Sequence, residues 1–185
     1  MIFALLSSVL AAAILSNILT QGIGLENLTK DEFRVKPVLK TTSVVSIASL
    51  LVFLIDYLIY NVVLLPLGAT YLNIFVLVIL MIILNELYQI LVSKLKFELP
   101  KGETIILNSV VILVGLLGLN SVSFELAFLE TVGSLLGFMA LTILLTMNIS
   151  RMRVAPMIKS FKGLPIVLIV LGLIILVLTG LGGIF

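Results

Sequence analysis

The stretch Thr104–Asn120, TIILNSVVILVGLLGLN, is apolar enough for a membrane interior but is interrupted by polar and helix-weakening residues. It is about 17 residues long, the short limit for a helix that crosses a bilayer. Asn108 and Ser109 stand side by side within it, and Gly115 and Gly118 follow. Unpaired polar groups are expensive in lipid, and glycine-interrupted helices persist there only where protein or a cavity satisfies the freed backbone groups. The stretch therefore predicts a broken or half-length helix that faces the protein interior.

A similar segment lies near the start of the chain. Ala12–Leu25 reads AAILSNILTQGIGL and holds an amide, Asn17, ahead of two glycines. Two short, interrupted segments in corresponding positions are typical of an inverted-repeat membrane protein, in which they meet near the membrane midplane. We therefore predict a midplane site formed by Asn17, Gln21, Gly22, Gly24, Asn108 and Ser109. The alternative is that the amides only cap broken helices or tie spans together.

The composition indicates a multi-pass membrane protein. The chain has 185 residues, of which 62% are hydrophobic and 11% charged, and its mean hydropathy is +1.38. No soluble domain has this balance. At about 20 residues per span, the length suffices for about six spans and leaves no room for a separate soluble domain. The predicted spans are Ile2–Gln21, Thr41–Asn61, Thr70–Val92, Thr104–Leu119, Leu126–Asn148 and Leu164–Leu181.

The basic residues fall in alternate loops. The chain has 11 of them, all in the first, third and fifth predicted loops, whereas the second and fourth loops and both tails have none. They are Lys30, Arg34, Lys36, Lys40, Lys94, Lys96, Lys101, Arg151, Arg153, Lys159 and Lys162. Because basic loops stay on the cytoplasmic side of a membrane, we predict cytoplasmic basic loops and both termini outside the cytoplasm.

The two halves of the chain resemble each other. Ser49–Leu54, SLLVFL, matches Ser134–Met139, SLLGFM, and the apolar runs that begin at Leu72 and Leu164 share several identical positions in the same order. Each half has three spans, and an odd number inverts the second half relative to the first. The predicted fold is an all-α membrane protein, a single transmembrane domain over residues 1–185. Its six helices form two inverted repeats, about 1–92 and about 104–185, with broken or half-length first and fourth helices.

Two acidic residues lie well inside predicted spans. Asp56 is about five residues from the outer end of the second span, and Glu86 is about six residues from the inner end of the third. Acidic residues inside a membrane indicate a functional site by default. We predict that Asp56 and Glu86 mark two ends of a cation path. The alternative is that each side chain reaches its nearer interface or pairs with a neighbouring helix.

Several function classes are excluded by the residues that the chain lacks. It has no cysteine and no histidine, so it supplies no thiolate or imidazole to a metal, haem or iron–sulfur cluster. It has no phosphate-binding loop, catalytic triad or metal-ligand spacing. Its net charge of +2 is too small to indicate nucleic-acid binding. Enzymatic activity stays open from these residues; at most, the chain is a subunit that is not catalytic alone.

With six spans, inverted halves and two asparagine-bearing broken segments, the chain resembles the RnfA/NqrE-type membrane subunits of the Rnf/Nqr family. The local similarity lies in Gln21–Leu25, QGIGL, in Leu54–Asp56, LID, in Glu86 ahead of a basic loop, and in the segment around Asn108. The resemblance implies a subunit of an ion-translocating electron-transport complex in a prokaryotic inner membrane. It also implies an oppositely oriented RnfE/NqrD-like partner.

In that family, cysteines of the two broken segments hold a [2Fe–2S] cluster in the middle of the membrane. At the matching positions this chain has Glu26 and Ser109, so Glu26 joins the residues of the predicted midplane site. A cluster of the usual kind is not ligated by this chain. Either an altered complex uses a different electron route, or this relative keeps the scaffold and has lost the electron-transfer step.

Three functions stay open from the sequence. The first is the RnfA/NqrE-like subunit, which would help to couple electron flow to cation movement. The second is a small cation transporter or channel component without redox chemistry, whose path would be lined by Asn17, Asn108, Asp56 and Glu86. The absence of cysteine favours this second function. The third is a structural assembly subunit.

Overall fold

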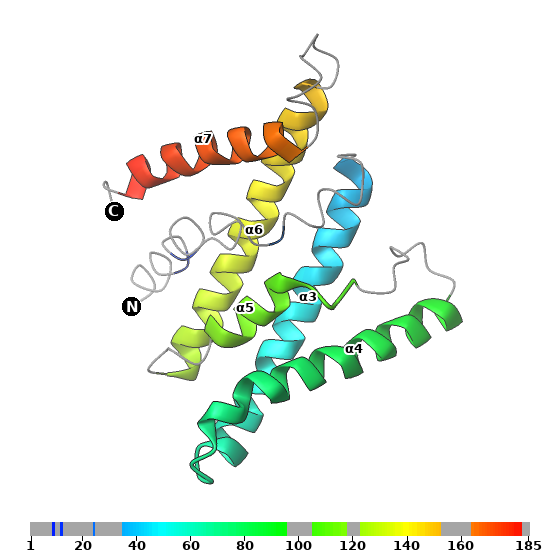
Figure 1. Ribbon diagram of the computed structural model, residues 1–185, viewed down its shortest axis with the longest axis vertical. Helices are drawn as coiled ribbons and strands as arrows, with labels where there is room; N and C mark the ends of the chain where they lie inside the picture. Colours follow the sequence, from blue (N-terminus) through cyan, green and yellow to red (C-terminus); the bar gives the residue numbers. More distant parts are fainter. Residues whose placement is uncertain are drawn as a thin grey trace. The chain divides into compact units, whose positions relative to one another are not determined.

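The computed structural model describes residues 9, 12, 24, 35–95, 105–117, 123–152 and 164–182, and these residues form helices and turns without any strand (Figure 1). The helices are α3 (Val35–Ile59), the π-helix η2 (Tyr60–Leu64), the 3-10 helix η3 (Thr70–Leu72), α4 (Asn73–Leu95), α5 (Ser109–Leu117), α6 (Phe124–Met152) and α7 (Leu164–Gly182). The predicted all-α class is confirmed for the described part of the chain. The six-helix inverted repeat stays a prediction.

Three of the described helical segments are long and apolar enough to cross a membrane, namely Val35–Leu64, Thr70–Lys94 and Phe124–Met152. A shorter apolar segment is Pro165–Gly180. These four segments correspond to the second, third, fifth and sixth predicted spans and support a membrane-embedded protein. The first predicted span lies almost entirely outside the described residues.

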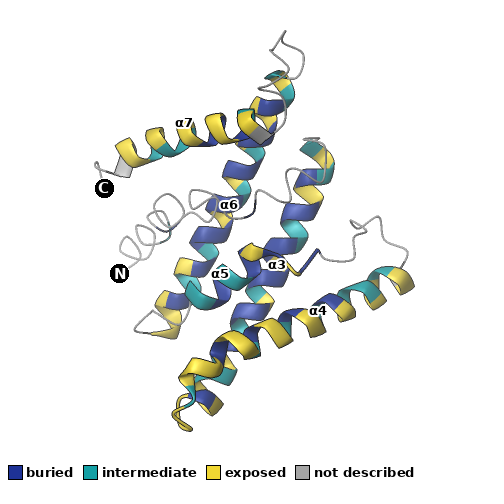
Figure 2. Ribbon diagram, viewed as in Figure 1, coloured by how far each residue is buried: buried dark blue, intermediate teal, exposed yellow. Residues whose placement is uncertain are grey.

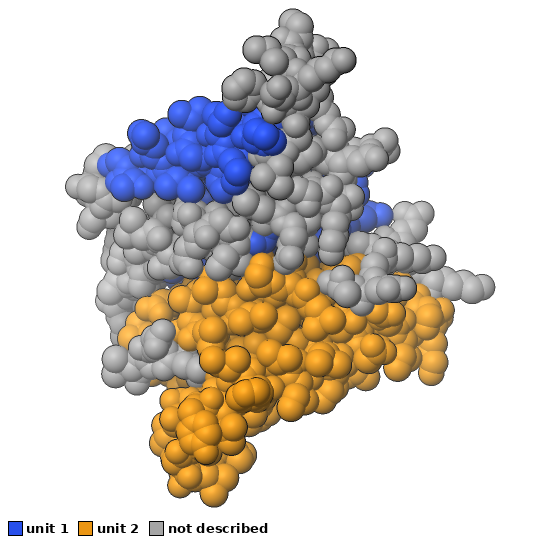
Figure 3. Space-filling model, viewed as in Figure 1, with its two compact units in different colours: residues 1–42, 132–185 blue, residues 43–131 orange. Residues whose placement is uncertain are grey.

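The chain divides into two compact units (Figure 3). One comprises residues 43–131, and the other comprises residues 1–42 together with 132–185. α3 and α6 each contribute to both units. The unit 43–131 combines parts of both predicted repeats, so the boundaries of the compact units differ from those of the predicted repeats.

In the unit 43–131, α3 leads into α4 through a tight connection. α3 continues through η2 to Leu64, and the turn that follows is closed by backbone hydrogen bonds from Ala69 N to Leu64 O at 3.0 Å and from Gly68 N to Leu65 O at 3.2 Å. Gly68 has φ +66°, a conformation that side chains with a Cβ rarely adopt. The sequence Pro66-Leu67-Gly68 thus forms the predicted break between two spans.

α3 begins earlier than the sequence predicts. Its described part starts at Val35, six residues before Thr41, where the predicted span begins. Pro37 is compatible with this start because the first turn of a helix does not need the N–H that proline lacks. Lys36 and Lys40 are exposed and belong to the first turns of the helix rather than to the preceding loop. The described helix therefore includes the last residues of the predicted basic loop.

α4 packs through one narrow stripe. Its buried residues Asn73, Leu77, Met81 and Asn85 recur every four positions, which places them on one side of a helix. Most of its other residues are exposed (Figure 2). Leu77 lies against Gly115 of α5, and a Cβ on Gly115 would clash with the Leu77 side chain. The glycine that weakens α5 therefore permits its close contact with α4.

In the other unit, α6 has buried residues at spacings of three and four, namely Leu135, Phe138, Leu141, Leu145 and Ile149. Gly133 of α6 lies so close to Val9 that a Cβ added to the glycine would be 2.6 Å from the backbone oxygen of Val9. α7 buries Val167, Val170 and Leu171, while most of its remaining surface is exposed (Figure 2).

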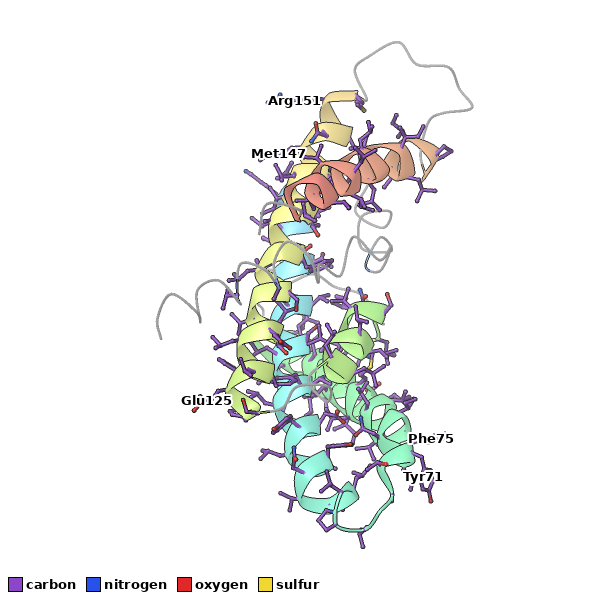
Figure 4. All side chains as sticks on the ribbon, turned by 90° about the vertical axis from the view of Figure 1, so that its left-hand side faces the viewer. Tyr71, Phe75, Glu125, Met147 and Arg151 are labelled. Carbon is purple, nitrogen blue, oxygen red and sulfur yellow. The ribbon has the colours of Figure 1, made fainter. Side chains whose placement is uncertain are left out.

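The ends of the long helices carry polar and aromatic residues. Glu125 and Arg151 lie in the first and last turns of α6, where their charges complement the helix dipole (Figure 4). Tyr71 and Phe75, at the start of the η3–α4 segment, are exposed and point outward (Figure 4). Aromatic residues of this kind are enriched at membrane–water interfaces. The turn between α3 and α4 therefore has the composition expected near one membrane surface.

Candidate functional site

Asp56 is the acidic side chain that the structure places inside an apolar helix pair. It lies on α3, eight residues before the end of η2, and its relative exposure is 0%. The neighbouring Val52 and Phe53 are also fully buried. A charged carboxylate in such surroundings is costly unless it is paired or neutralised. The alternative in which Asp56 reaches water at its nearer interface therefore does not fit its burial, whereas the alternative of pairing with a neighbouring helix matches its hydrogen bond to Asn73 of α4.

Asn73 is the residue that contacts Asp56. Its amide nitrogen Nδ2 donates a hydrogen bond to Asp56 Oδ2 across 3.3 Å. The connection described above sets this register, because η3 ends at Leu72 and α4 begins at Asn73, alongside the last turns of α3. Asn73 has a relative exposure of only 4%, so the pair is shielded from the surroundings.

The pair leaves two oxygen atoms without partners. Asp56 Oδ1 and Asn73 Oδ1 are both buried, and neither has a hydrogen-bond partner among the described residues. Carboxylate and amide oxygens are hard ligands of the kind that bind protons and alkali cations. The amide can donate to an ionised carboxylate, and after a half-turn about its terminal bond it can accept from a protonated one. The arrangement is therefore able to hold Asp56 in either state.

Hydroxyl groups follow the same side of α3 toward its start. Ser49, two turns before Asp56, donates its hydroxyl hydrogen to Val45 O at 2.8 Å, as hydroxyls in helices commonly do. Ser46 is 7% exposed, and its hydroxyl has no hydrogen-bond partner among the described residues. The buried side of α3 is thus partly polar over almost three turns rather than purely apolar.

Glu86 lies apart from this pair. It is exposed on α4, whereas its neighbour Asn85 is 3% exposed and accepts a hydrogen bond from Ile106 N at 3.4 Å. Glu86 is 13 positions after Asn73 on the same helix, about 20 Å along its axis. Asp56 and Glu86 therefore do not form one site among the described residues, and their roles at two ends of a path stay a prediction.

In the second interrupted segment, Asn108 caps a helix. Its Oδ1 accepts a hydrogen bond from Val110 N at 3.0 Å, and α5 begins at the next residue, Ser109. Residues 105–107 form a bend, and α5 begins at Ser109, five residues after the predicted start of the fourth span. Asn108 is buried, whereas Ser109 is exposed and its hydroxyl lies 3.5 Å from Asn108 Oδ1. This geometry matches the capping alternative for Asn108.

The first interrupted segment is largely outside the described residues. Gly24 is described, and it is buried in a turn with φ +87°, a conformation that glycine adopts readily. The predicted site residues Asn17, Gln21, Gly22 and Glu26 lie outside the described part of the chain. The predicted meeting of the two segments at the membrane midplane therefore stays a prediction.

Asn73 and Asn85 contact other parts of the chain, and neither is among the site residues predicted from the sequence. Asn73 lies in the apolar run that begins at Leu72, and Asn85 directly follows that run, beside Glu86. The available signal was the spacing of four between Asn73, Leu77, Met81 and Asn85, because residues four positions apart are neighbours and form one slanting row along a helix. Each amide connects α4 to a different neighbouring segment.

The described residues contain no cluster of three or more acidic side chains that could hold a metal ion. Ser109 stands where the resembled family has a cysteine, and an exposed hydroxyl beside an amide is not an iron ligand of that kind. The chain therefore does not fit the family's [2Fe–2S] cluster. No protein-family model and no curated protein matches the sequence.

Proposed function

We propose that this chain is a membrane subunit of an ion-translocating electron-transport complex of the RnfA/NqrE type, and that it binds a monovalent cation at Asp56. The observation that carries the cation site is the burial of the Asp56–Asn73 pair with one unpartnered oxygen on each side chain. The link to a redox complex comes from the resemblance of QGIGL, LID and the Asn108 segment to that family.

A buried carboxylate can take up a cation in two chemically related forms. A proton on Asp56 Oδ1 removes the charge, and a sodium ion between Asp56 Oδ1 and Asn73 Oδ1 compensates it. In both cases the cation satisfies oxygen atoms that otherwise stay buried without partners. Release of the cation leaves these oxygen atoms buried without partners again, which raises the free energy of the protein. Release must therefore be coupled to a process that is itself favourable. In the proposed complex, this process is electron transfer in other subunits.

The chain ligates no cofactor in this proposal. Electron transfer therefore runs through partner subunits, including an oppositely oriented RnfE/NqrD-like paralogue. The exposed acidic side chain of Glu86 supports such a partner, because a carboxylate on the outer surface of an apolar helix is unfavourable against lipid. A partner that covers Glu86 with a polar surface removes this cost.

The second candidate function is a small cation transporter or channel component without redox chemistry, and a purely structural assembly subunit is the third. The complete absence of cysteine favours the transporter over the redox subunit. The same Asp56–Asn73 pair would then bind the transported cation, so the two leading functions share one site and differ in their partners.

Purification from the native membrane distinguishes these functions. We expect the full-length chain to co-purify with flavin- and iron-bearing subunits, detected by absorption spectroscopy and mass spectrometry. A colourless homo-oligomer would contradict the redox-complex proposal and favour the transporter. If cation transport by that homo-oligomer is lost in Asp56→Asn, the cation site survives the failure of the redox assignment.

A further inference from the structure

An apolar groove lies between α3 and α4, and its α3 residues are on a different side of that helix from Asp56 by the 3.6-residue period. It is lined by Val44, Ile47, Ala48 and Leu51 of α3, by Leu84, Leu87, Tyr88 and Leu91 of α4, and by Ile106. All these residues belong to the unit 43–131. The groove has a volume of about 370 Å³. Its lining is aliphatic except for the aromatic ring and hydroxyl of Tyr88, and it contains no charged side chain.

Two features of the sequence keep this groove open. Ala48 is the smallest side chain of the α3 lining and leaves space where a leucine would fill it. At the other side, Ile106 is held in place because Asn85 Oδ1 accepts the hydrogen bond from its backbone N–H at 3.4 Å. The groove is therefore a built feature of α3, α4 and the segment before α5, rather than a gap at a chain end.

We propose that the groove holds an acyl chain of an anionic phospholipid, whose phosphate group lies at Lys94. Lys94 is exposed in the last turn of α4, three residues after Leu91 of the groove. Positions separated by three residues are neighbours on a helix surface, so Lys94 follows the groove lining by about one helical turn, within the length of a lysine side chain. Basic side chains beside a transmembrane groove attract anionic headgroups.

The chemistry of the groove favours a lipid. Its lining contains no charged side chain, and Lys94 is the one basic residue of α4. An apolar groove beside a single basic side chain matches a molecule that combines a hydrocarbon chain with an anionic headgroup. The nearest acidic residue on α4, Glu86, lies on a different side of the helix by the 3.6-residue period, so it does not oppose the phosphate.

Native mass spectrometry of the full-length protein with added lipid tests this proposal. We expect the wild-type chain to retain one phosphatidylglycerol at least about fivefold more tightly than one phosphatidylcholine with the same acyl chains, the effect expected of one lysine near an anionic lipid. Lys94→Gln should abolish this preference without weakening the binding of phosphatidylcholine. Equal retention of the two lipids by the wild-type chain would overturn the headgroup assignment.

Filling the groove tests the acyl-chain site directly. Ala48→Phe should lower the retention of both lipids about tenfold. The matched control is Ala140→Phe, because Ala140 is exposed on α6 and a phenylalanine there fills no groove. Unchanged retention in Ala48→Phe would overturn the proposal. If Ala48→Phe does not fold, the milder Ala48→Val provides the same test, and Lys94, being exposed, tolerates substitution in either case.

Discussion

The side-chain amide of Asn73 donates a hydrogen bond to the carboxylate of Asp56 across 3.3 Å, between residues that are 17 positions apart in the chain. The contact joins the last turns of α3 to the first residue of α4 and is buried on both sides. It combines a structural role, the register of the α3–α4 hairpin, with the proposed chemical role of a cation site. The predictions below separate these roles.

Asn73→Leu should destabilise the protein, because it removes the amide that donates to Asp56 Oδ2 while the carboxylate stays buried. A buried group that loses its hydrogen-bond partner costs about 1–3 kcal/mol of unfolding free energy. The measurement is unfolding of the purified chain in detergent micelles. The control is Asn61→Leu, because Asn61 is exposed and donates to the backbone oxygen of Tyr57, one turn earlier in the continuous α3–η2 segment. Equal stability of the two variants would show that the Asp56–Asn73 bond contributes nothing measurable.

Asn108→Ala should destabilise α5, because Asn108 Oδ1 accepts the hydrogen bond from Val110 N that caps the helix. Loss of such a cap costs about 0.5–2 kcal/mol, whereas Asn108→Ser should retain most of the stability. Asn148→Ala is the control, since Asn148 is exposed within α6 and donates to Leu144 O. The measurement is the free energy of unfolding of each variant. If Asn108→Ser lowers it as much as Asn108→Ala does, the capping role is refuted.

Gly115→Leu should disrupt the contact between α5 and α4, because even a Cβ on Gly115 clashes with the buried side chain of Leu77. Overpacking of this kind costs about 1–3 kcal/mol. Gly172→Leu is a matched control on α7, where a Cβ meets no atom within 4 Å. We expect a lower thermal unfolding midpoint for Gly115→Leu only. A similar decrease in both variants would indicate a general effect of leucine at helix glycines.

Glu86→Gln should leave the stability of the isolated chain unchanged, because Glu86 is exposed. Within an assembled complex the same substitution should lower cation transport, since the proposed path reaches Glu86 only where a partner subunit covers it. Transport by membrane vesicles that contain the whole complex is the measurement. Normal transport in this variant would remove Glu86 from the path and leave Asp56 as the one candidate of the pair.

The sequence predicted helix positions well where composition alone decides them. The segments around Thr70–Val92 and Leu164–Leu181 agree with η3–α4 and α7 to within a few residues, because long apolar runs bounded by turn residues have one stable form in a membrane. The start of α3 was misplaced because Lys36 and Lys40 were assigned to a loop. Charged side chains of this length can remain in water while their backbone is helical.

The candidate site was predicted only in part. Asp56 stood out because acidic residues are rare in apolar spans. Its partner Asn73 did not, because the contact depends on the length of the turn between α3 and α4 and on the register that this turn imposes. The role of Asn108 was left between a midplane site and a cap, and only the position of its Oδ1 relative to Val110 N distinguishes these.

Infrared difference spectroscopy of the full-length chain in nanodiscs tests the central claim, that Asp56 binds a monovalent cation inside the protein. We predict a C=O stretching band of a buried carboxyl group that changes with pH, that is absent in Asp56→Asn and that is retained in Glu86→Gln. If added sodium abolishes this band, the bound cation is sodium, and if sodium has no effect, it is a proton. Identical difference spectra for the wild-type chain and Asp56→Asn would contradict the account.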